Sequence, residues 1–147
     1  MRLPTIARRV MGTRAGRLFA SRLGNPLFDA AWYRERYPDV PAGLRAWIHW
    51  RRHGWREGRD PSVAFQTRWY LERNRDVAAR RMDPLEHYLR WGAAEGRQPS
   101  PSFEPAWYLE RYPDVAASGD DPLLHYLRHG RMEDRLTQPP AARPTRS

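Results

Sequence analysis

Three histidines recur at one position of a repeated pattern, and histidine is the side chain best suited to bind a metal or transfer protons near neutral pH. They are His49, His87 and His125. A zinc site needs three or four ligands that converge on one point. One histidine per copy, stepped along a row of copies, does not converge. We therefore interpret each as a histidine beside a helix–helix contact, hydrogen-bonded to backbone, and expect no metal or other cofactor.

Carboxylates recur as well, and paired carboxylates can act as general acid and base. They are Asp39, Asp76, Asp114, Glu57, Glu95 and Glu133. The alternative is capping and turn chemistry, with each glutamate paired to Arg59, Arg97 or Arg135. An active site is normally built once, so side chains copied three times favour structure, and we expect no enzyme activity. A competing hypothesis, an enzyme with a site shared between copies, predicts that only one of the three histidines is indispensable.

The composition excludes several reaction classes. The 147 residues include no cysteine, which removes disulfides, thiolate metal sites and cysteine nucleophiles. All 26 basic residues are arginine, which removes Schiff-base chemistry and the phosphate-loop lysine. No glycine-rich phosphate loop, His-Glu-x-x-His pair or Gly-x-Ser-x-Gly elbow is present.

The seven tryptophans divide into two groups. Trp32, Trp69 and Trp107 recur in every copy, and we expect them in the core. Trp47, Trp50, Trp55 and Trp91 are not shared by all copies, and we expect partial exposure. An exposed aromatic face near arginine suits stacking on sugar rings or packing on a partner protein, with core packing as the alternative use. The candidate partner- or glycan-binding residues are Trp50, Trp55, Trp91, Arg59, Arg97, Arg135, His49, His87 and His125.

These residues are positioned by a sequence repeat. The run Phe-Asp-x-x-Trp-Tyr that begins at Phe28 recurs at Phe65 and Phe103 with small changes, and Asp-Pro-Leu-x-His-Tyr-Leu occurs at residues 83–89 and 121–127. The first copy is looser in this second half. We therefore divide the chain into a basic segment, three units of about 38 residues and a disordered tail. Their ranges are 1–27, 28–64 (unit 1), 65–102 (unit 2), 103–138 (unit 3) and 139–147.

The first half of each unit predicts a short helix. Asp29 is a good N-cap, and Phe28 and Tyr33 stand at the positions that form a hydrophobic staple. Pro105 fits the first helical position of unit 3. The helix should end near the residue before proline, as at Tyr112, with a weaker stop in unit 2, where Asn74-Arg75 replaces Tyr-Pro.

The second half predicts another helix. Asp83 and Asp121 are N-caps followed by proline, and Gly92 and Gly130 fit the left-handed position after a helix. Helices of roughly 8–10 residues are not stable alone in water. We therefore expect an all-α fold of three tandem helical hairpins, a short solenoid or compact helical array, whose aromatic faces are buried against the neighbouring unit.

The net charge of +9 is concentrated at the ends of the chain. Residues 1–27 hold six arginines and no acidic residue, whereas residues 28–138 hold 18 arginines against 17 acidic residues. A folded basic face is therefore not supported, and nucleic acid is a disfavoured partner. Residues 1–24 are either a basic helix on an anionic membrane surface or a disordered arm.

The unit resembles a repeat found in bacterial surface-polysaccharide proteins. The pattern is Phe-Asp-x-x-Trp-Tyr-Leu-x-x-Tyr-Pro-Asp-Val, followed by Asp-Pro-Leu-x-His-Tyr-Leu-x-x-Gly-x-x-Glu-Gly-Arg-x-Pro-Ser, and it covers residues 28–138. In that family the repeat accompanies glycosyltransferase, rhamnan-synthesis or sulfotransferase domains.

The resemblance implies a non-catalytic module that binds a glycan-assembly enzyme or its polysaccharide. It also implies a location in the cytoplasm or at the inner face of the cell membrane. The alternatives are a peripheral membrane or nucleic-acid binder that acts through the Arg-rich N-terminus, and a fragment of a glycosyltransferase-associated enzyme. No catalytic residue is carried over from the family.

Overall fold

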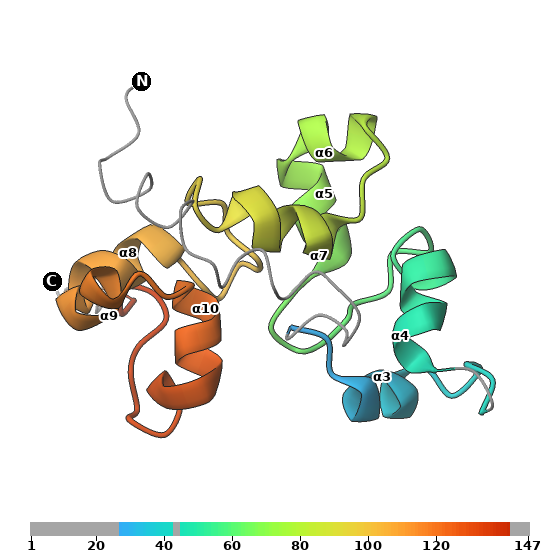
Figure 1. Cartoon of the computed structure of the whole chain (residues 1–147), viewed down its shortest axis with the longest axis horizontal. Coiled ribbons are helices and arrows are strands. Elements are labelled where there is room, and N and C mark those ends of the chain that lie inside the picture. The colour runs from blue at the N-terminus through green and yellow to red at the C-terminus, as the bar shows by residue number, and fades with distance from the viewer. Residues whose placement is uncertain (1–26, 43–44, 142–147) are drawn as a thin grey trace, which may run out of the picture.

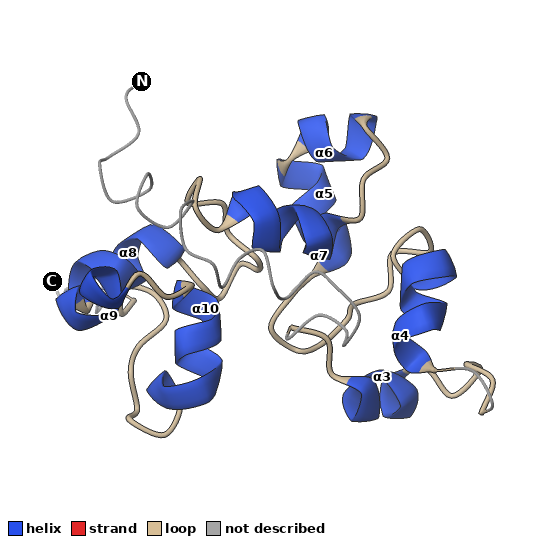
Figure 2. Ribbon diagram, in the orientation of Figure 1, coloured by secondary structure: helices blue, strands red, loops and turns tan. Residues whose placement is uncertain are grey.

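The computed structural model describes residues 27–42 and 45–141, which form helices joined by loops (Figure 1, Figure 2). Within these ranges there is no strand, only isolated antiparallel bridges between Ser62 and Phe65 and between Ser100 and Phe103. The predicted all-α helical array is confirmed. The interpretations of residues 1–26 and of the end of the tail, residues 142–147, fall outside the described ranges.

Units 2 and 3 share one order of helices, and unit 1 has the same first and last elements. In every unit the second-half helix ends in a π-helical turn, labelled η. The elements are α3 (Ala30–Arg36), α4 (Ala46–His49), η1 (Trp50–Gly54), α5 (Thr67–Arg73), α6 (Arg75–Ala79), α7 (Pro84–His87), η2 (Tyr88–Gly92), α8 (Pro105–Arg111), α9 (Pro113–Ser118), α10 (Pro122–His125) and η3 (Tyr126–Gly130).

The predicted helix starts are confirmed. An Asp29 carboxylate oxygen accepts a hydrogen bond from the Trp32 backbone N–H at 3.0 Å, and the Phe28 and Tyr33 rings lie 5.2 Å apart, as in a staple. Pro105 occupies the first turn of α8. Asp83 and Asp121 cap α7 and α10 in the same way, each followed by proline. Their carboxylates satisfy N–H groups that the first helical turn leaves without partners.

The prediction that the first helix of unit 2 has a weaker end than the other two is wrong. α5 ends at Arg73, and Asn74 leaves the helix with φ −120°, close to the −122° of Tyr112 after α8. The Asn74 side-chain amide donates to the Tyr70 carbonyl at 2.8 Å. The same carbonyl accepts from the Asn74 backbone N–H at 2.9 Å, as the Tyr108 carbonyl does from Tyr112, so Asn74 adds a second hydrogen bond at the end of α5 without a following proline.

Each of units 2 and 3 contains one helix more than the predicted hairpin. After the stop, the chain turns into α6 in unit 2 and α9 in unit 3. Each has one buried valine, Val77 or Val115, and the other residues of both helices remain largely exposed. A single apolar residue gives no helical periodicity, which is why the sequence pattern did not indicate these helices.

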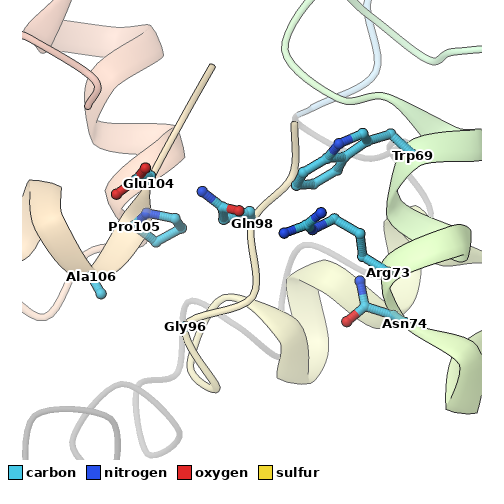
Figure 3. Close-up of a pocket in the computed structure, with 8 residues that line it drawn as sticks. All are labelled: Trp69, Arg73, Asn74, Gly96, Gln98, Glu104, Pro105 and Ala106. Carbon is cyan, nitrogen blue, oxygen red and sulfur yellow. The ribbon is translucent and has the colours of Figure 1, made fainter. Parts of the chain in front are cut away.

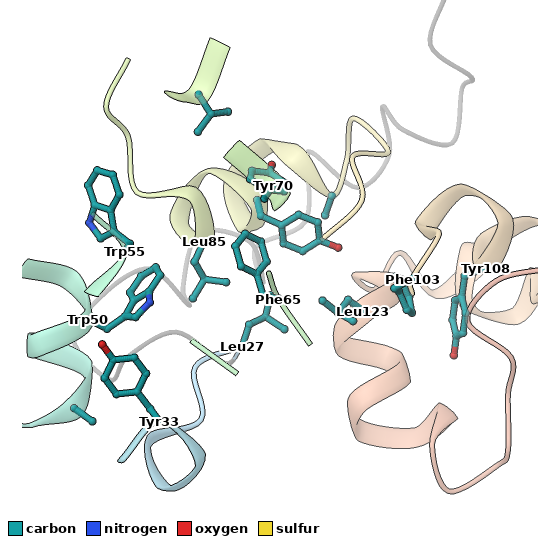
Figure 4. Close-up of a cluster of buried hydrophobic side chains, with 14 of the residues drawn as sticks. Leu27, Tyr33, Trp50, Trp55, Phe65, Tyr70, Leu85, Phe103, Tyr108 and Leu123 are labelled. Atoms are coloured by element: carbon teal, nitrogen blue, oxygen red, sulfur yellow. The ribbon is translucent and has the colours of Figure 1, made fainter. Parts of the chain in front are cut away.

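The ring-to-ring contacts of the aromatic core lie within each unit, whereas the buried side chains of all three units join in one hydrophobic cluster. In unit 2, Phe65 contacts Tyr70 of α5 (Figure 4) and also Tyr88 of η2. The ring centres lie 5.0 and 5.8 Å apart, respectively. Unit 3 repeats this arrangement with Phe103, Tyr108 and Tyr126, and unit 1 with Phe28, Tyr33 and Trp50. The phenylalanine before each first helix thus packs against both helices of its own unit.

The ends of each unit meet through backbone hydrogen bonds. Asp29 N–H donates to the Pro61 carbonyl at 3.0 Å, and Gln66 N–H donates to the Pro99 carbonyl at the same distance. Units 1 and 2 are joined by polar contacts: the Asp60 carboxylate accepts from Thr67 N–H at 2.8 Å, and an Arg68 N–H donates to the Glu57 carbonyl. Asp60 thereby supplies the N-terminal cap of α5 that Gln66 does not.

Candidate functional site

The three histidines of the repeat each bind a tyrosine hydroxyl of their own unit. Nδ1 of His49 lies 2.9 Å from the Tyr33 hydroxyl, Nδ1 of His87 lies 2.8 Å from that of Tyr70, and His125 and Tyr108 repeat the contact at 3.0 Å. The hydrogen bond to backbone predicted for these histidines is therefore replaced by one to a side chain. Burial lowers the pKa of each histidine, and it raises the pKa of Tyr108 to about 12.

Gly92 and Gly130, which were predicted to adopt the left-handed conformation just after a helix, do not adopt it. Gly92 and Gly130 are the last residues of η2 and η3, and the described glycines with positive φ are Gly58, Gly96 and Gly119. A Cβ atom added to Gly92 or Gly130 would overlap the hydroxyl of Tyr70 or Tyr108. The sequence requires glycine here because a tyrosine from the facing helix occupies the space of a side chain.

The recurring arginines make ion pairs within their own units. Arg97 binds both carboxylate oxygens of Asp76, at 2.8 and 2.9 Å, and also binds Glu95 at 2.6 Å. Arg59 and Arg135 do the same, with Asp39 and Glu57 and with Asp114 and Glu133. The predicted Glu–Arg pairs are present, and each arginine also holds the aspartate that follows the first helix.

These ion pairs keep the recurring aspartates, the candidate general acids and bases, in their ionised form. The hydrogen bond from Arg97 lowers the pKa of Asp76 to about 2, and the equivalent arginines lower the pKa of Asp39 and Asp114. Because these carboxylates stay ionised and paired, they tie the segment that follows the first helix to the closing loop of the unit.

Two of the tryptophans predicted to be partly exposed, Trp47 and Trp91, are so, and the other five lie differently from the prediction. Trp50 and Trp55 are buried, with 0% and 8% of their surface exposed, because Trp50 packs between Phe28 and Trp47 and the Trp55 N–H donates to the Arg51 carbonyl. Trp91 is 36% exposed. Trp32, Trp69 and Trp107, expected in the core, are only half-buried. Each lies on the first helix of its unit, directly before the buried tyrosine of the aromatic cluster.

One of these half-buried tryptophans lines a cleft between units 2 and 3 (Figure 3). Trp69 and Arg73 of α5 form one side, and Glu104 and Pro105 at the start of α8 form the other. Gln98 of the connecting loop lies between them. The cleft has a volume of about 340 Å³, at the lower end of the range of roughly 300–1,000 Å³ for small-molecule sites.

The polar groups of the cleft are of both charge types. The Arg73 guanidinium lies 4.9 Å from the centre of the Trp69 ring, a cation–π contact. Glu104 brings a carboxylate, and Gln98 brings an amide that can both donate and accept. Among the residues that the structure describes, neither Arg73 nor Glu104 forms an ion pair. The cleft therefore has donors, acceptors and an aromatic surface without a dominant charge.

Sequence reasoning did not select these cleft residues. Trp69 is expected in the core because it recurs, and Arg73, which recurs as Arg36 and Arg111, enters no predicted site. The remaining lining side chains differ between the copies, as at Asn74, Gln98, Glu104 and Pro105. The signal that could have found the site is the substitution of Asn74 for the tyrosine of the other two units, since Asn74 also lines the cleft.

The chain was compared with protein-family models, curated proteins and solved structures, and none of these matches it. In the described ranges, no three histidine, aspartate or glutamate side chains gather closely enough to hold a metal ion. None of the helices described here has the length and apolar character needed to cross a membrane.

Proposed function

We propose that the chain is a non-catalytic helical module that binds a glycan or a glycan-assembly protein in bacterial cell-surface polysaccharide biosynthesis. The observation that carries this proposal is the cleft between units 2 and 3, whose aromatic ring and polar groups are open to a ligand. The recurring histidines and arginines support the non-catalytic part, because each is engaged in a contact within its own unit. The resemblance of residues 28–138 to polysaccharide-associated repeats supplies the pathway.

The structure favours some of the predicted binding residues over others. Trp91 presents an exposed ring with the Arg90 guanidinium 5.9 Å from its centre, so it remains a candidate contact. Trp50 and Trp55 are buried and would have to leave the core to touch a partner. Arg59, Arg97 and Arg135 would have to exchange an intramolecular carboxylate for one on the partner. We therefore place the binding role first on the cleft.

The test is binding by the full chain combined with an assay for turnover. We expect the chain to be retarded in gels that contain a neutral bacterial polysaccharide, or to co-elute in gel filtration with a glycosyltransferase of bacterial surface-polysaccharide assembly. We expect no sugar transfer from nucleotide sugars by the chain alone. Turnover of a nucleotide sugar, or the absence of both kinds of binding, would contradict the proposal.

A second candidate function is favoured by the six arginines of residues 1–27, which no acidic residue balances. Such a segment can bind anionic lipid or nucleic acid electrostatically. Co-sedimentation with anionic liposomes and with DNA, for the full chain and for a chain that begins at Asn25, tests this function. Equal and weak binding by both chains would exclude it.

A further inference from the structure

In unit 2, the cleft occupies the position that a tyrosine ring fills in units 1 and 3. Tyr37 follows α3 and Tyr112 follows α8, whereas Asn74 follows α5. Trp32 contacts Tyr37 edge-on at 6.3 Å, and Trp107 contacts Tyr112 in the same way at 6.5 Å. Trp69 is the equivalent of both tryptophans, and its neighbour is the smaller Asn74. The space beside Trp69 is the cleft.

Two further groups surround the tyrosine in units 1 and 3. The arginine of the closing loop stacks over its ring, with Arg59 4.9 Å from the centre of Tyr37 and Arg135 4.7 Å from that of Tyr112. The tyrosine hydroxyl accepts a hydrogen bond from a backbone N–H, that of Asp60 or Leu136, at 2.8 Å. In units 1 and 3, three groups therefore hold the phenol ring of the tyrosine: a tryptophan in edge-on contact, an arginine guanidinium and a backbone N–H donor.

Unit 2 contains the equivalents of the tryptophan, the arginine and the backbone N–H donor, but it has no tyrosine ring between them. Trp69 and Gln98, which is equivalent to Asp60 and Leu136, line the cleft, and Arg97 donates to Asn74. Within the described part of the chain, the Gln98 backbone N–H has no hydrogen-bond partner. A hydroxyl group from outside the chain can accept this hydrogen bond.

We propose that the cleft between α5 and α8 binds an uncharged pyranose ring, as a single sugar or as one residue of a glycan. The apolar face of a pyranose can pack on the Trp69 ring, and one of its hydroxyls can take the place of the tyrosine hydroxyl at Gln98 N–H. The remaining hydroxyls both donate and accept, which matches the Arg73 guanidinium, the Gln98 amide and the Glu104 carboxylate. This inference rests on the proposed binding function and names its ligand class.

A neutral sugar fits the cleft better than the other ring-bearing ligands. The Glu104 carboxylate repels an anionic sugar such as a uronic acid, and the Arg73 guanidinium repels a cationic one. A tyrosine side chain of a partner protein would satisfy Gln98 N–H with its one hydroxyl. It would leave the guanidinium and the carboxylate of the cleft without new partners.

The decisive variant returns unit 2 to the residue that the other units contain. Asn74→Tyr should place a ring in the cleft with its hydroxyl at Gln98 N–H, and Arg97 can stack over that ring as Arg59 and Arg135 do. Its matched control is Arg75→Pro, which restores the neighbouring proline of the pattern outside the cleft. A second pair is Trp69→Ala against Trp107→Ala, equivalent half-buried tryptophans of which only Trp69 lines the cleft.

The measurement is tryptophan fluorescence and two-dimensional NMR of the full chain, titrated with the methyl glycosides of glucose, galactose, mannose and rhamnose. Glucuronate and N-acetyltyrosine amide serve as the charged and phenolic probes, and circular dichroism checks the fold of each variant. We expect at least one neutral glycoside to bind with shifts at Gln98 and Trp69. We expect Asn74→Tyr and Trp69→Ala to weaken this binding roughly tenfold or more, with both controls unchanged.

Each other outcome overturns the inference in a recognisable way. Unchanged sugar binding by Asn74→Tyr would exclude the cleft while leaving the proposed binding function intact. Binding of N-acetyltyrosine amide in preference to the glycosides would assign the cleft to a protein partner. If none of the probes binds, the cleft is not a sugar site, and the proposed function then rests on the co-elution experiment with the glycosyltransferase alone.

Discussion

The Tyr70 hydroxyl and Nδ1 of His87 lie 2.8 Å apart in the interior of unit 2, directly beside the backbone of Gly92. Both side chains are buried, and each is the other's hydrogen-bond partner. The same three residue types meet in units 1 and 3. This cluster fixes the first helix of the unit against the second.

Removing the tyrosine hydroxyl should destabilise the chain. Tyr70→Phe leaves the His87 ring nitrogen without its buried partner, and we expect a loss of about 1–3 kcal/mol in the free energy of unfolding, measured with urea. Tyr88→Phe is the matched control, because the Tyr88 hydroxyl is buried and has no hydrogen-bond partner among the residues that the structure describes. That change should be neutral or stabilising. Equal losses in the two variants would mean that the hydrogen bond does not contribute.

A methyl group at Gly92 should be more harmful than one at Gly96. Gly92→Ala places Cβ against the Tyr70 hydroxyl, and we expect a loss of about 1–3 kcal/mol although alanine is the better helix former. A Cβ at Gly96 meets no atom of the described part of the chain within 4 Å, and its φ of +72° alone gives a loss of about 1 kcal/mol. The double variant Gly92→Ala, Tyr70→Phe should show a favourable coupling energy in urea unfolding, and strictly additive losses would contradict the overlap.

Glycine should stabilise two positions that adopt positive φ. Arg81 and Asp134 have φ values of 51° and 53°, and glycine stands at the equivalents of both: Gly119 for Arg81, and Gly58 and Gly96 for Asp134. Relief of the left-handed strain exceeds the entropy that glycine adds to the unfolded chain, so we expect a gain of about 0.5 kcal/mol from Arg81→Gly and from Asp134→Gly. A fall in the thermal midpoint for either variant would argue against strain at that position.

The capping aspartates should make stability fall as the pH rises from about 4 to about 6. Burial raises the pKa of Asp83 and of Asp121 from 3.8 to about 6 in the folded chain. A group whose folded pKa is raised contributes its stability below the unfolded pKa, and that contribution is lost as the pH passes the folded pKa. The loss is up to about 3 kcal/mol for each carboxyl.

Asparagine at these positions tests the pH dependence. It is an equally good N-cap and has no charge, so Asp83→Asn and Asp121→Asn should keep the helix starts and flatten the curve between pH 4 and 6. Asp76→Asn is the contrasting variant, because the folded pKa of Asp76 is lowered to about 2, so its contribution is lost as the pH falls from about 4 to about 2. A pH profile of Asp83→Asn with the wild-type slope above pH 4 would contradict the assignment.

The sequence by itself determined the helical class, the helix starts and the Glu–Arg pairs. These depend on neighbours in the chain: the Asp29 and Asp83 caps act within one turn, and Arg97 pairs with Glu95 two residues away. Local hydrogen bonds of this kind follow from residue type and spacing alone. The departure at Asn74 was also visible in the sequence, but its consequence was not.

Only the tertiary structure decided which helices pack together and what the repeated residues contact. Gly92 resembled a helix end because glycine serves both left-handed turns and close approaches, and its space is taken by Tyr70, 22 residues earlier. Trp69 resembled a core residue because it recurs, and its exposure depends on whether the residue after α5 fills the space beside it. Such contacts join residues far apart in the chain, so spacing and residue type could not reveal them before the fold was known.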